Sequence, residues 1–126
     1  MPFSITKSVL AIGFALALAA PAMAVETSMQ IVLELKGNAQ RDVKTYQCEG
    51  VEPFDVEYVN ASPIFLAFVP VAGEKLLFVN VLSASGARYA SGEWEWWTKG
   101  SEATLTDLTA EKGTAPLSCL EHSETP

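Results

Sequence analysis

The feature that most constrains this chain is a succession of short apolar segments between turn-forming residues, without convincing helical periodicity after residue 24. Residues 29–35 and 54–58 alternate apolar and polar side chains, which is the period of a half-buried strand. Residues 64–71 and 76–82 are apolar at almost every position, and residues 76–82 are rich in β-forming side chains. The pattern predicts an all-β fold.

The remaining segments bring the series to seven or eight short strands within about 100 residues. This number predicts a small antiparallel β-barrel or a sandwich, and a barrel of about eight strands would leave no apolar edge exposed. The further strands are expected at residues 43–48, 88–90, 93–98, 103–107 and 116–120, and the turns at 37–38, 60–63, 72–75, 83–87, 90–92 and 98–101.

The first 24 residues have the pattern of a secretory signal peptide. One positive charge, Lys7, precedes an apolar run over residues 9–20, which is too short to span a membrane. Ala22-Met23-Ala24 then fits the small-x-small cleavage rule, so we expect cleavage after Ala24 and one exported domain over residues 25–126. No cysteine follows the apolar run, so no lipid anchor is expected in the mature chain.

The expected mature domain is strongly acidic. Residues 25–126 hold 15 acidic and 7 basic side chains, a formal charge of −8. Such a charge argues against binding to nucleic acid or to anionic lipid, and it favours a basic protein partner. A negative charge also keeps exported proteins soluble, and this simpler interpretation stays open.

Two cysteines, Cys48 and Cys119, fall near the two ends of the expected domain. In an oxidising compartment an even number of cysteines forms disulfides, so the sequence predicts one Cys48–Cys119 bond. Two cysteines and one distant histidine lack the spacing of a metal site, and we expect no metal or cofactor.

Few residues could support catalysis. The single histidine, His122, lies in the acidic C-terminal segment, whereas a catalytic histidine needs an oriented, shielded position. Glu93 and Glu95 share one face of a strand, where an exposed acidic surface is the favoured interpretation. We therefore expect that the protein is not an enzyme.

Three tryptophans lie on one expected strand. Trp94 and Trp96 share a face that is expected in the core, and Trp97 points the other way. Aromatic rings can also stack on sugars, so a glycan-binding or small-ligand-binding barrel is the alternative hypothesis.

Ser85 and Lys99 are the polar residues that the turns single out. Each stands beside a glycine, Gly86 or Gly100, in a turn where small residues allow close approach to a partner. A turn serine and a surface lysine are common on their own. If both turns lie at the same end of the barrel, however, a hydroxyl and an ammonium would project together.

At this stretch the chain resembles the bacterial inhibitors of c-type lysozyme, which are called MliC when lipid-anchored and PliC when periplasmic. The resemblance covers residues 46–119, and the ordered pair of motifs at 83–89 and 97–103 is its most specific part. The matching residues are Tyr46-x-Cys48, Val56-x-Tyr58-x-Asn60, Ser83-Ala84-Ser85-Gly86-Ala87-Arg88-Tyr89, Trp97-x-Lys99-Gly100-x-Glu102-Ala103 and Cys119.

The resemblance implies an eight-stranded antiparallel barrel whose Ser85 loop enters the active-site cleft of a c-type lysozyme. In that family the serine and the lysine of the two motifs, here Ser85 and Lys99, address the enzyme's two catalytic carboxylates. Gly86, Arg88, Tyr89 and Gly100 complete the expected binding region. Arg88 and Tyr89 are expected to brace the loop, and Tyr89 could also reach the partner. Without a lipid-attachment cysteine, the chain matches the soluble periplasmic branch, while a ligand-binding barrel and a purely structural envelope protein remain the alternatives.

Overall fold

The computed structural model describes residues 11–22 and 28–122. The chain divides into two units, Met1–Val32 and Leu33–Pro126. The described residues of the first unit form neither helix nor strand. Across the described ranges, no helix is both long and apolar enough to cross a membrane. The expected cleavage after Ala24 falls outside the described residues.

The second unit is a closed antiparallel β-barrel in which each strand pairs with the next one in the sequence. This confirms the predicted all-β fold and decides for a barrel against a sandwich. The eight strands are β1 (Gln40–Cys48), β2 (Phe54–Ala61), β3 (Ile64–Val71), β4 (Glu74–Val81), β5 (Ala87–Ser91), β6 (Trp94–Lys99), β7 (Glu102–Asp107) and β8 (Leu117–Glu121).

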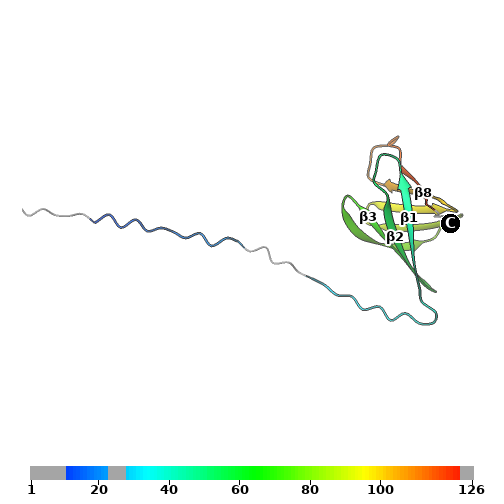
Figure 1. Cartoon of the computed structure of the whole chain (residues 1–126), viewed down its shortest axis with the longest axis horizontal. Coiled ribbons are helices and arrows are strands. Elements are labelled where there is room, and N and C mark those ends of the chain that lie inside the picture. Colours follow the sequence, from blue (N-terminus) through cyan, green and yellow to red (C-terminus); the bar gives the residue numbers. More distant parts are fainter. Residues whose placement is uncertain (1–10, 23–27, 123–126) are drawn as a thin grey trace, which may run out of the picture. The chain divides into compact units, whose positions relative to one another are not determined.

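The barrel closes where β8 pairs with β1, and Figure 1 shows these two strands side by side. Three residue pairs make the junction, and the last of them is Cys48 opposite Cys119. Their side chains form the predicted disulfide, which joins residues 71 positions apart. The backbone N–H of His122 extends the junction by donating to the carbonyl of Thr45 at 2.8 Å.

Large side chains fill the centre of the barrel. The largest buried ones are those of Trp96, Tyr46, Phe78, Val56 and Val69, none of them more than 2% exposed. The Trp96 indole N–H donates to the hydroxyl of Tyr58 at 2.9 Å, and the Tyr46 and Tyr58 hydroxyls lie 2.8 Å apart. Burial, and then the hydrogen bond with Tyr58, raise the pKa of Tyr46 far above its ordinary value, so the phenol stays neutral.

The strand predicted at residues 29–35 is wrong. Residues 28–39 contain no strand, and β1 begins at Gln40, three residues before the predicted start. Met29 and Ile31 are 81% and 71% exposed. Alternation alone does not make a strand, because the segment needs a partner, and a closed barrel has no free edge to offer.

Several predicted turns are shorter in the structure. Four predicted turn pairs belong to strands rather than turns, namely Asn60-Ala61, Glu74-Lys75, Ala90-Ser91 and Thr98-Lys99, and Ala87 begins β5. Small and polar residues continue a strand wherever a neighbouring strand satisfies their backbone groups. The other predicted strands are present with boundaries shifted by at most three residues.

We expect the Cys48→Ser/Cys119→Ser double variant to lose about 4 kcal/mol of unfolding free energy, since the bond closes a long loop of the unfolded chain. Urea denaturation measures this loss. The wild-type protein unfolded under reducing conditions is the matched control and should show the same midpoint as the variant. An unchanged midpoint in both would mean that the hydrogen-bonded junction alone holds the barrel closed.

Candidate binding site at the Ser85 loop

The loop of residues 82–86 and the turn Gly100-Ser101 emerge at the same end of the barrel. In a closed barrel of consecutive antiparallel strands, connections alternate between the two ends, and these two connections are separated by one other. The side chains of Ser85 and Lys99 are both exposed there. The two turns therefore lie at the same end of the barrel, as the hypothesis about Ser85 and Lys99 requires.

Gly86 lets the loop lie directly against β6. Its φ of 64° falls in the left-handed region that favours glycine. A Cβ added at this position would overlap the carbonyl oxygen of Thr98 and come within 2.8 Å of Cγ of Lys99. Gly100 also has a positive φ, 60°, but its Cβ position is open. Of these two positions, only Gly86 must be glycine because the loop backbone packs directly against β6.

Trp97 contacts both the Ser85 loop and the Lys99 side chain. Its indole N–H donates to the backbone carbonyl of Ser85 at 2.9 Å. Nζ of Lys99 lies 4.3 Å from the centre of the Trp97 ring, within the range of a cation–π interaction. Within the loop, the Ser83 hydroxyl donates to the carbonyl of Gly86 at 3.2 Å. Ser85, Gly86 and Lys99 therefore form one connected surface.

Arg88 and Tyr89 differ in their placement. Arg88 lies on the outer wall, where its guanidinium is 3.6 Å from the Glu95 carboxylate and 5.9 Å from the Trp97 ring centre. Tyr89 is only 6% exposed and packs against Tyr58 in the core, with ring centres 5.7 Å apart. Its position suits bracing of the loop from inside and leaves little of it for a partner.

Sequence reasoning missed two residues of this region. The sequence predicts that Trp97 points outward, but not that it joins the two turns; the available signal was its place as the first residue of the second motif, two residues before Lys99. The pattern predicts Leu82 as the last residue of the strand over 76–82, whereas β4 ends at Val81 and Leu82 begins the loop, 93% exposed.

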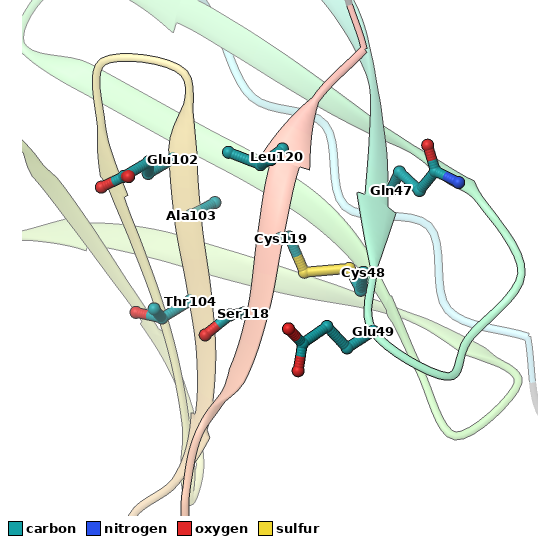
Figure 2. A pocket seen from close by; sticks show the side chains of 9 residues that line it. All are labelled: Gln47, Cys48, Glu49, Glu102, Ala103, Thr104, Ser118, Cys119 and Leu120. Atoms are coloured by element: carbon teal, nitrogen blue, oxygen red, sulfur yellow. A yellow bond between two sulfur atoms is a disulfide. The ribbon is translucent and has the colours of Figure 1, made fainter.

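A shallow hollow of about 520 Å³ lies on the barrel wall over β7, β8 and the end of β1, as Figure 2 shows. A smaller hollow of about 210 Å³, lined by Trp97 and Lys99, shares Glu102, Ala103 and Thr104 with it. The two hollows therefore lie next to each other, on either side of these β7 residues. Its lining is Gln47, Cys48, Glu49, Glu102, Ala103, Thr104, Ser118, Cys119 and Leu120.

This lining provides no catalytic constellation. It contains two carboxylates, Glu49 and Glu102, but no histidine and no cysteine outside the disulfide. In the ranges that the structure describes, no group of three or more His, Cys, Asp or Glu side chains could hold a metal ion. The arrangement of the region suits the binding of a partner rather than chemistry.

Comparison with known proteins identifies a family. The family described as membrane-bound lysozyme-inhibitor of c-type lysozyme (MliC) matches residues 46–113, more than half of the chain. The chain belongs to this family. The match covers both motifs, and it confirms the resemblance inferred from the sequence.

Two relatives bear the name membrane-bound lysozyme inhibitor of C-type lysozyme. The one from Pseudomonas aeruginosa is 43% identical over 100 residues, 76% of this chain and 79% of the relative. The one from Cupriavidus necator is 46% identical over 71 residues, 56% of this chain and 57% of the relative. A solved structure, P. aeruginosa MliC in complex with hen egg white lysozyme, is 40% identical, with a TM-score of 0.60. The structural match covers 77% of this chain and 100% of the P. aeruginosa MliC chain.

We expect Gly86→Ala to displace the loop, because the new methyl group would overlap the backbone of β6. The measurements are the thermal unfolding midpoint and the NMR signal of the Trp97 indole N–H, which should shift as its bond to Ser85 is lost. Gly92→Ala is the matched control, since Gly92 also has a positive φ but an open Cβ position at the other end of the barrel. Equal destabilisation of both variants, with an unshifted Trp97 signal, would contradict this explanation.

Proposed function

We propose that this protein inhibits c-type lysozyme by occluding its active site and that it performs no catalysis. The observation that carries the proposal is the exposed pair of Ser85 and Lys99 at one end of the barrel, where the Ser85 carbonyl and the Lys99 ammonium both contact the Trp97 indole. Support comes from the family and from its P. aeruginosa member, whose structure was solved in complex with hen egg white lysozyme.

The two side chains match the chemistry of the proposed target. A lysozyme of this type uses one protonated carboxylic acid and one ionised carboxylate. The Ser85 hydroxyl can hydrogen-bond the acid, and the Lys99 ammonium can pair with the carboxylate. Inside a cleft that excludes water, such charge-assisted contacts become stronger, although both charges lose their hydration. The inserted loop would also deny the sugar chain its binding subsites.

The charge of the inhibitor supports a basic target. The whole chain carries a formal charge of −7, and residues 25–126 carry −8. Opposite charges speed the diffusional encounter of two proteins and make its rate sensitive to salt. Lys99 places a local positive charge on an otherwise acidic protein. This suits a side chain that pairs with the catalytic carboxylates of the lysozyme rather than with the basic surface around them.

We propose a soluble periplasmic location, with residues 1–24 acting as a cleaved signal peptide. The relatives are named membrane-bound. In this chain both cysteines are joined in the disulfide, so neither is free to carry a lipid.

The alternative, a barrel that binds a glycan or a small ligand, receives less support. Its natural binding place would be the barrel centre, which is filled by Trp96, Phe78 and Tyr46. Trp96 is fully buried and Trp94 is partly buried against the same core, so little of these two rings is free for sugar stacking. Such a barrel would show changes in tryptophan fluorescence with free sugars and no effect on lysozyme.

We expect the purified protein to suppress clearing of a cell-wall suspension by a c-type lysozyme at about equimolar ratio. Turbidity measures the clearing, and titration at fixed lysozyme concentration gives the inhibition constant. Undiminished clearing at a large excess of folded protein would rule out the proposed function.

We expect Lys99→Ala to raise the inhibition constant roughly 30-fold or more, since truncating one partner of a desolvated charge pair costs about 2 kcal/mol or more. Ser85→Ala should raise it roughly tenfold, through one lost hydrogen bond. Lys112→Ala is the matched control: it makes the same charge change at an exposed loop residue of the opposite end. Wild-type potency of the Ser85→Ala/Lys99→Ala double variant would move the site elsewhere.

A further inference from the structure

We propose that Trp97 is the positioning residue of the inhibitory end, because a single indole holds both Ser85 and Lys99 in place before the partner arrives. The inference rests on the proposed function and adds to it a residue that touches neither lysozyme carboxylate in the proposed mechanism. Three observations carry it: the hydrogen bond to Ser85, the contact with Lys99, and the way in which the ring itself is held.

The first contact ties the loop to the barrel wall. Among the described residues, the Trp97 N–H bond to the Ser85 carbonyl is the side-chain hydrogen bond that links loop 82–86 to β6. The other side-chain hydrogen bond of the loop, from Ser83 to Gly86, is internal to it. A net hydrogen bond corresponds to about two- to tenfold in an equilibrium constant. Without this bond, the hydroxyl of Ser85 would lose its fixed place.

The second contact restrains a flexible cation. A lysine side chain has many rotamers, and ordering it on binding weakens affinity. Lys99 and Trp97 are two residues apart on β6, so their side chains leave the same face of the strand, and Nζ already lies 4.3 Å from the ring centre. An exposed cation–π contact corresponds to about two- to fivefold in an equilibrium constant. Part of the ordering is thus complete in the free protein.

The ring is itself fixed on the wall. Trp97 is paired in the sheet with Arg88 of β5 and with Thr104 of β7, so its backbone is held on both sides. The Arg88 guanidinium lies 5.9 Å from the ring centre and is also near the Glu95 carboxylate. Trp97 is only half-buried, whereas its neighbour Trp96 is fully buried. Replacing Trp97 therefore leaves the barrel core filled.

Two substitutions separate the two contacts. Trp97→Phe keeps an aromatic face for Lys99 but removes the N–H that holds Ser85, and we expect about a fivefold rise in the inhibition constant. Trp97→Leu removes both, and we expect a rise of twentyfold or more. Trp94→Phe is the matched control, because it trims a tryptophan of the same strand that contacts the core instead of Ser85 or Lys99.

Double-mutant cycles distinguish positioning from general loss of structure. In the Ser85→Ala background, Trp97→Phe should change the inhibition constant less than twofold, while in the Lys99→Ala background it should keep its fivefold effect. A merely structural tryptophan would weaken inhibition equally in both backgrounds, and that result would overturn the proposal. Wild-type potency of both single variants, Trp97→Phe and Trp97→Leu, would also overturn the proposal.

NMR of the free wild-type protein tests the positioning without lysozyme. The Lys99 side-chain protons next to the ring should show upfield ring-current shifts, and the Trp97 indole N–H should be protected from hydrogen exchange. Ordinary lysine shifts and a fast-exchanging indole would overturn the inference even if the protein inhibits lysozyme. Conversely, a protein with both signatures that fails to inhibit lysozyme would refute the proposed function and leave the positioning of the two groups confirmed.

Discussion

The pairing of β8 with β1 is the constraint on which the rest of the structure depends. It turns a row of eight strands into a barrel with no free edge, and the Cys48–Cys119 bond stands within this pairing. Once the barrel is closed, alternation along each strand divides side chains into an inner and an outer set. Trp96 and Phe78 then fill the centre, while Trp97 and Lys99 are left on the wall.

The proposed inhibitory end depends on this separation of inner and outer side chains. On the inside, Tyr89 of β5 and Trp96 of β6 are buried in the core. On the outside, Gly86 lets the Ser85 loop approach β6 closely enough for the indole of Trp97 to reach its backbone. A loop held in this way loses little conformational freedom when it meets a partner, which favours affinity without additional contact area.

Much of the fold was predictable from the sequence, because β-strands leave a local signal, either an alternation of apolar and polar residues or a short continuous apolar run. Residues 64–71 were predicted as a strand with the boundaries that β3 has. The prediction at residues 29–35 failed because their alternation resembles that of residues 54–58, but a strand forms only against a partner. Ser85 and Lys99 were found through turn chemistry and the family motifs, whereas the role of Trp97 was not visible, since it depends on a side-chain conformation and on the path of a loop.

By itself, the sequence determined the all-β class, the disulfide, the family and the two motifs, because each is expressed in residue type and spacing along the chain. Only the tertiary structure decided that the barrel closes with Gln40 as its first strand residue, that Tyr89 is buried, and that Ser85 and Lys99 meet on one indole. The physical reason is that these features are contacts between segments, and they exist only after the strands have paired and the side chains have packed.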